Sequence, residues 1–195
     1  MIRVFKNLCK AVLKSITDEA IFWNVTYSFR FHDKKCPRCG AYGKLYPYGD
    51  YPRFFVFLRD GKTVSRRIRP FRFKCASCKA THALLPYIII PYSPYSLGFI
   101  LTVLVAYFER ETTVAEICGR FGIAVSTLYA FKKRLAAHKQ LLIGIFLSMK
   151  KPALAFLRGI ISSESISAIL GKFFRRYSFS FLQNRTDAVV QSIPP

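Results

Sequence analysis

Two short stretches of sequence decide the fold: Cys36-Pro-Arg-Cys39-Gly40 and Cys75-Ala-Ser-Cys78-Lys79. Each places two cysteines three positions apart, so that a tight turn aims both sulfurs at one ion, and two such turns complete a tetrahedron. Between them, Asp60-Gly61 separates two strand-like runs, Tyr51 to Arg59 and Lys62 to Ile68. Asp-Gly suits the positive φ angles of a tight hairpin turn. The spacing therefore predicts a zinc ribbon in which a β-hairpin brings the two cysteine pairs together.

The paired cysteines predict one structural Zn²⁺. Four thiolates leave no open position for water or substrate, unlike the shell of a catalytic zinc. The predicted ligands are Cys36, Cys39, Cys75 and Cys78. Two coincidental pairs or a redox pair are the alternatives, but the chain around the cysteines lacks the βαβ pattern of a thioredoxin-like motif. His82 is a substitute ligand only if the four cysteines do not already close the shell.

The charge of the chain points to a polyanionic partner. Lys and Arg number 31 against 10 Asp and Glu, which gives a formal charge of +21. Such a field attracts nucleic acid, and an anionic membrane surface would exploit the same sign. The ribbon alternates basic and aromatic residues, which suggests a cationic strand face for phosphate contacts. The arginines predicted to make these contacts are Arg53, Arg66, Arg67, Arg69 and Arg72.

An uncharged window challenges a soluble interpretation. Residues 80–108 contain no Lys, Arg, Asp or Glu. Pro86, Pro91 and Pro94 interrupt the first half, so the remaining helical stretch is shorter than the roughly 20 residues that a bilayer requires. We predict a core helix there rather than a membrane span. Basic residues scattered through residues 1–16 also differ from a signal peptide, so a cytoplasmic location is expected.

Three short helices are expected after the ribbon. Ser93-Pro94 predicts a helix start, with the helix running to about Arg110. Thr113-Val-Ala-Glu116 is a capping-box sequence that opens a second helix, which Gly122 should end. The third is expected from about Val125 to Ala137. Together they predict a trihelical unit.

The second and third helices have helix-turn-helix spacing. Cys118 lies four positions before Gly122, which gives a small side chain where the helices approach and a glycine at the turn. An ordinary helical hairpin is the alternative. In a helix-turn-helix, the first residues of the third helix face the major groove. The predicted DNA-binding residues there are Ser126, Tyr129, Lys132, Lys133 and Arg134.

These patterns define an α+β chain of four parts. An N-terminal packing segment, residues 1–31, ends in a strand-like run from Val25 to Phe31. The zinc ribbon occupies residues 32–92 and the helix-turn-helix residues 93–138. The last part, residues 139–195, has helical patterns near 141–149 and 163–176 and no legible role.

The motifs resemble bacterial insertion-sequence proteins that join an N-terminal zinc ribbon to a helix-turn-helix, including an uncharacterised family of transposase-related proteins. The likeness covers residues 32–137 and is carried by the first cysteine motif, by Arg69-Pro-Phe-Arg-Phe-Lys-Cys75-Ala-Ser-Cys78 and by Phe121-Gly-Ile-Ala-Val-Ser-Thr-Leu-Tyr129. It implies zinc binding and recognition of element DNA in the bacterial nucleoid. Ala124 departs from this pattern, because Ser or Thr usually precedes the recognition helix.

The sequence thus predicts a non-enzymatic DNA-binding protein, an accessory factor, regulator or non-catalytic fragment of a mobile element. Besides DNA, its expected partners are a separate transposase subunit or a second copy of the chain. An alternative is a metal-dependent nuclease or transposase, which needs clustered carboxylates. The candidates are Asp33, Asp50, Asp60, Glu109, Glu111 and Glu116. A second alternative is a membrane-associated basic protein.

Overall fold

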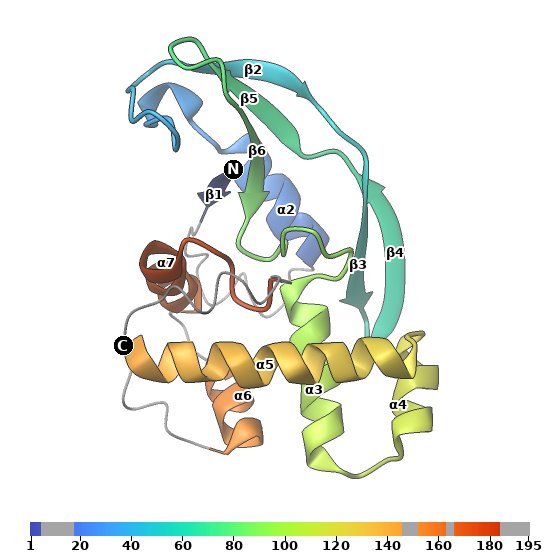
Figure 1. Cartoon of the computed structure of the whole chain (residues 1–195). Coiled ribbons are helices and arrows are strands. Elements are labelled where there is room, and N and C mark those ends of the chain that lie inside the picture. The colour runs from blue at the N-terminus through green and yellow to red at the C-terminus, as the bar shows by residue number, and fades with distance from the viewer. Residues whose placement is uncertain (5–17, 146–151, 163–165, 184–195) are drawn as a thin grey trace.

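The computed structural model describes residues 1–4, 18–145, 152–162 and 166–183 (Figure 1). It is a mixed α+β structure in which a sheet and a hairpin precede most of the helices. The sheet has the order β1-β6-β5-β2, and β3 and β4 form a separate two-stranded hairpin. The strands are β1 (Ile2–Val4), β2 (Leu45–Asp50), β3 (Arg53–Arg59), β4 (Lys62–Ile68), β5 (Phe71–Cys75) and β6 (Thr81–Pro86).

The β3–β4 hairpin confirms the predicted turn. Arg59 pairs with Lys62, and Asp60 and Gly61 between them have φ angles of 50° and 72°. β2 runs into β3 and β4 runs into β5, so that the strands form one long curved ribbon (Figure 1). The hairpin end of the ribbon reaches the helices, where the Thr63 hydroxyl donates to the carbonyl of Phe121 at 3.1 Å.

The helices lie mainly at the hairpin end of the ribbon (Figure 1). Their bounds are α2 (Asp18–Tyr27), the 3₁₀ turn η1 (Phe31–Asp33), α3 (Leu97–Glu109), α4 (Val114–Phe121), α5 (Val125–Ile145), α6 (Ala153–Ser162) and α7 (Ile166–Tyr177). The predicted capping box at Thr113 and Glu116 is present, and Gly122 ends α4 with φ of 64°. The axis turns by 100° between α4 and α5. α5 extends further than the predicted end at Ala137.

Two expected elements are wrong. The run from Val25 was predicted to be a strand, but α2 continues to Tyr27 because Phe22 and Val25, three positions apart, bury one helical face. The helix predicted to start at Ser93 starts after Ser96, whose hydroxyl accepts from the N–H of Phe99. Residues 94–96 instead pair with β3, where the N–H of Val56 donates to the Pro94 carbonyl at 2.8 Å.

One large core unites the helices with part of the ribbon. Phe55 and Phe57 of β3 are fully buried together with Phe99 of α3 and Phe131 of α5. Much of this core comes from the uncharged window, residues 80–108. As predicted, the apolar helix of that window, α3, is buried in the core. In the C-terminal region, Phe173 packs against other buried aromatic rings.

Parts of the expected organisation lie outside the described residues, namely residues 5–17 of the N-terminal packing segment and residues 146–149 of the helical candidate 141–149. The first five residues of that candidate belong to α5. Within the described residues, no single helix is both long and apolar enough to cross a bilayer. Two bent pairs, α4 with α5 and α6 with α7, reach that length and apolar content only jointly.

Candidate metal centre and ribbon surface

The four predicted cysteines come together at the end of the ribbon opposite the hairpin. Their sulfur atoms all lie within 4.8 Å of one another. The Sγ atoms of Cys36 and Cys78 are 3.7 Å apart, and so are those of Cys39 and Cys75. A disulfide would require about 2.05 Å, so these are not bonded pairs. A tetrahedral ion with metal–sulfur bonds of about 2.3 Å separates its ligands by about 3.8 Å, so the sulfurs fit one such ion.

The two cysteine turns repeat one backbone pattern. In the first, the N–H of Gly40 donates to the Cys36 carbonyl at 2.9 Å; in the second, the N–H of Lys79 donates to the Cys75 carbonyl at 2.9 Å. Gly40 and Lys79 both have positive φ, at 73° and 59°. Such a conformation is unfavourable for a lysine side chain, by roughly 1–2 kcal/mol. Because Lys79 adopts it, the second turn has the same backbone conformation and hydrogen bond as the first.

The surroundings of Cys75 favour ionisation of its thiol, whereas those of Cys39 oppose it. The N–H of Cys78, together with that of Ser77, lowers the pKa of Cys75 to about 6. The N–H of Ala41 acts in the same direction on Cys39, but desolvation and the neighbouring thiols outweigh it and raise the pKa of Cys39 to about 11. Four adjacent thiols therefore do not all ionise at neutral pH by themselves. A divalent cation held by the four sulfurs would supply the charge that favours their ionisation.

His82 lies beside the cluster. Its Nε2 is 3.3 Å from the sulfur of Cys36, both residues are buried, and burial lowers the pKa of His82. A metal-bound thiolate only accepts hydrogen bonds, so Nε2 would carry the proton and donate. In that arrangement His82 would orient a cysteine rather than replace one. The sequence indicated that His82 lies near the site but could not predict this contact, because Cys36 and His82 are 46 positions apart and are brought together by β6.

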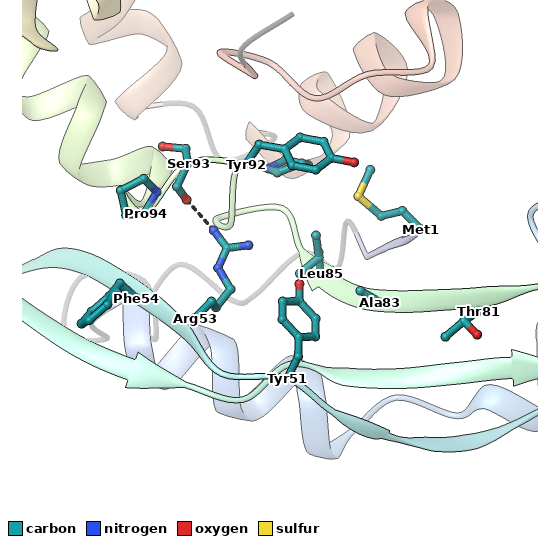
Figure 2. Close-up of a pocket in the computed structure, with 11 residues that line it drawn as sticks. Met1, Tyr51, Arg53, Phe54, Thr81, Ala83, Leu85, Tyr92, Ser93 and Pro94 are labelled. Carbon is teal, nitrogen blue, oxygen red and sulfur yellow. Dashed lines mark hydrogen bonds between the residues drawn. The ribbon is translucent and has the colours of Figure 1, made fainter.

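Three of the five ribbon arginines engage groups within the chain. Arg53 donates to two backbone carbonyls of the loop before α3, those of Ile90 and Ser93, and Figure 2 shows the bond to Ser93. Arg66 and Arg69 lie 3.7 Å and 2.7 Å from the carboxylates of Glu19 and Asp50. These ion pairs are solvent-exposed on the arginine side, so each contributes little to stability and leaves the arginine able to exchange its partner.

The other two arginines lie over exposed aromatic rings. The guanidinium of Arg67 is 5.2 Å from the ring centre of Phe54, and that of Arg72 is 5.9 Å from the ring centre of Tyr48. Lys74 is also over Tyr48, at 4.8 Å. Within the described part of the chain, none of these three cations has a carboxylate within 4.0 Å. Arg72 and Lys74 share one ring, and all three cations can therefore pair with an anion from outside the chain.

The start of α5 presents part of the predicted DNA-binding set to solvent. Ser126 and Lys133 are exposed, and 47% of the Tyr129 surface is accessible. The other two residues of the set are half-buried. Lys132 donates to the Tyr107 hydroxyl at 2.9 Å, while Arg134 donates to the Leu182 carbonyl at 3.4 Å and burial lowers its pKa.

The carboxylates considered for an enzyme are dispersed and several have partners. Asp50 pairs with Arg69, Glu109 pairs with Arg158 at 2.7 Å, and Glu116 accepts from the N–H of Thr113. Among the described residues, the four cysteines form the one group of three or more side chains placed to hold a metal.

The chain is therefore a mixed α+β protein with a four-cysteine cluster that could hold a metal ion. A family model described as a domain of unknown function, DUF6431, matches residues 36–127. That span begins at the first cysteine of the cluster and ends in the first turn of α5, so it contains the ribbon, α3 and α4. No curated protein and no solved structure matches the chain.

Proposed function

We propose that this chain is a DNA-binding protein with one structural zinc, acting as an accessory factor, regulator or non-catalytic fragment of a transposable element. The observation that carries the proposal is the spacing of 3.7 Å between paired sulfurs in a chain of formal charge +21. A closed four-thiolate shell holds the ribbon in shape, and the shaped ribbon presents cations to phosphate.

Zinc is the metal that this donor set favours. Four soft thiolates in a tetrahedron select zinc or iron–sulfur chemistry over the hard cations that prefer oxygen. Two short turns around a single compact sulfur cluster are typical of structural zinc. The ion would have no open coordination position, so its role is to fold the ribbon rather than to activate water.

The DNA-binding part of the proposal uses α4 and α5 as a helix-turn-helix. Their 100° bend falls within the roughly 90–120° of that motif, and Gly122 makes the turn. The exposed start of α5 would enter the major groove with Ser126, Tyr129 and Lys133. These residues include no Arg, Asn or Gln, the side chains that read bases with two hydrogen bonds. We therefore expect modest base selectivity and strong phosphate dependence.

The test is binding of the zinc-loaded chain to a labelled duplex across a salt series. Tight binding should weaken steeply as salt rises, because each phosphate contact releases counterions. Lys133→Ala should reduce the slope of log affinity against log salt by about 0.9. Ser126→Ala with Tyr129→Ala should weaken binding without changing that slope, because neither residue is charged.

Lys172→Ala is the charge-matched control. Lys172 is exposed on α7, away from the start of α5 (Figure 1). Lys172→Ala removes the same charge as Lys133→Ala. An equal change in slope for both variants would show that DNA responds to the overall positive charge of the chain rather than to a helix docked in the groove. Absence of duplex binding at low salt by the folded, zinc-loaded chain would overturn the proposal.

A further inference from the structure

Exposed aromatic side chains lie on the ribbon and on the loop beside it. Tyr48 on β2 is 47% exposed, Phe54 on β3 is 56% exposed, and Tyr92 in the loop before α3 is 89% exposed. Aromatic rings usually gain free energy by burial, so exposed rings such as these are candidates for contact with a partner. Phe54 and Tyr92 line one cavity. Cations lie over two of these rings, Tyr48 and Phe54.

Strand register places Arg72 and Lys74 on the same side of the four-stranded sheet as a neighbouring cavity. Lys74 of β5 is paired with Thr81 of β6, and Arg72 is paired with Ala83. Directly paired residues of an antiparallel sheet project from the same face. Thr81 and Ala83 in turn line a cavity of about 640 Å³. The cationic face therefore continues into the cavity.

The cavity has an aromatic and basic wall. Tyr51, Arg53 and Phe54 contribute from the ribbon, and Tyr92 contributes from the loop opposite (Figure 2). Arg53 donates to the backbone of that loop and fixes its position. Tyr92 itself has φ of 60°, an uncommon conformation for a bulky residue, and it is held there with its ring in solvent.

The same loop connects the cavity to α5. Tyr92, Ser93 and Pro94 line both this cavity and a smaller one of about 300 Å³, whose other wall includes Ser126 and Thr127. Tyr92 thus stands between the ribbon face and the helix start that the proposed function places in the major groove.

We infer that this surface, from Tyr48 and Arg72 through the cavity to Tyr92, binds an unpaired nucleic-acid strand. Bases stack on Tyr48, Phe54 and Tyr92, and phosphates lie beside Arg67, Arg72 and Lys74. A duplex hides its base faces, whereas a single strand offers both flat rings and negative charge. The inference rests on the proposed function and deepens it, because α5 then holds duplex while the ribbon holds a strand that leaves it.

The experiment compares three probes with the full zinc-loaded chain: a labelled thymidine strand, an abasic strand of equal length and charge, and a duplex. The thymidine strand should bind at least about fivefold more tightly than the abasic strand, because stacking requires bases. Phe54→Ala and Tyr92→Ala should each weaken thymidine-strand binding at least about fivefold and leave duplex binding nearly unchanged. Tyr92→Trp should retain it.

Tyr27→Ala is the matched control. Tyr27 is 73% exposed but contacts Phe71, which belongs to the opposite face of the sheet from Arg72. Equal binding of the abasic and thymidine strands would overturn the inference, and so would equal losses from Tyr27→Ala and Tyr92→Ala. Duplex binding without single-strand binding would overturn this inference alone, whereas failure of every nucleic acid would overturn the proposed function as well. Binding of vesicles of anionic lipid in place of the strand would assign the face to membranes and overturn it.

Discussion

The cysteine end of the ribbon and the helical half differ in how much apolar surface each buries. Among the described residues, the cysteine end has a small core of six buried side chains, and Cys36 and Cys75 are two of them. The helical half shares a large core that contains Phe99, Phe131 and many other fully buried side chains. A unit with so small a core gains little free energy from burial, so we expect a metal ion held by the cysteines to supply much of its stability. The helices hold together by packing.

The boundary between these two regions runs through the ribbon, not at its end. Phe55 and Phe57 of β3 belong to the helical core, although the sequence placed the whole stretch up to residue 92 in one zinc-bound part. β2 and β5 pack on the cysteine core instead. The hairpin is therefore expected to survive changes that unfold the cysteine end.

Removing the metal should have the largest effect. Structural zinc contributes an apparent binding free energy of roughly 10–16 kcal/mol to small zinc units at pH 7. With a chelator, or in a Cys75→Ser variant, hydrogen exchange should accelerate at residues 34–50 and 71–82 and stay slow in β3 and α3. Mass spectrometry of exchanged peptides measures this. Equal acceleration throughout the chain would show that the two regions are a single cooperative unit.

Truncating the helical core should produce the converse result. Phe131→Ala removes a fully buried ring and should lower the free energy of unfolding by about 3–5 kcal/mol. Zinc stoichiometry, measured by metal analysis of the folded chain, should not change. Val125→Ala, at an exposed position of the same helix, is the control and should shift stability by about 0.5 kcal/mol or less. Loss of zinc from the folded Phe131→Ala variant would show that the metal centre depends on the helical core.

Removing the histidine beside Cys36 should weaken the metal centre without emptying it. His82→Leu deletes the hydrogen bond to the thiolate and should lower zinc affinity about 10–100-fold, as losses of such supporting contacts do. Competition with a chromophoric chelator measures the affinity. His32→Leu is the control, because His32 is exposed and outside the sulfur cluster. Equal effects of both variants would contradict a specific contact.

The smallest effect is expected at the start of α4. Thr113→Ala removes the helix cap and should lower the free energy of unfolding by about 1 kcal/mol.

Hydrogen bonding from Thr113 lowers the pKa of Glu116. Glu116 therefore stabilises the fold above its ordinary pKa and loses that effect as the pH falls through its lower folded pKa. The stability difference between the natural chain and Glu116→Ala should accordingly shrink in acid. A difference that grows in acid would contradict the cap.

Features set by neighbouring residues could be predicted from the sequence. Each cysteine turn closes hydrogen bonds within five positions, and the hairpin at Asp60-Gly61 and the cap at Thr113 are equally local. Residue types and spacing alone specify such contacts, because the chain has few other ways to satisfy those backbone groups. The four candidate ligands and the α+β class followed from them.

Contacts between distant segments were decided only by the tertiary structure. β6 brings His82 to Cys36, and the pairing of residues 94–96 with β3 moves the start of α3 to Ser96. Arg53 and Arg72 look alike in the sequence, yet one is tied to backbone carbonyls and the other lies over Tyr48. Packing assigns these roles, because the burial of a side chain and the identity of its partner depend on which elements meet in space.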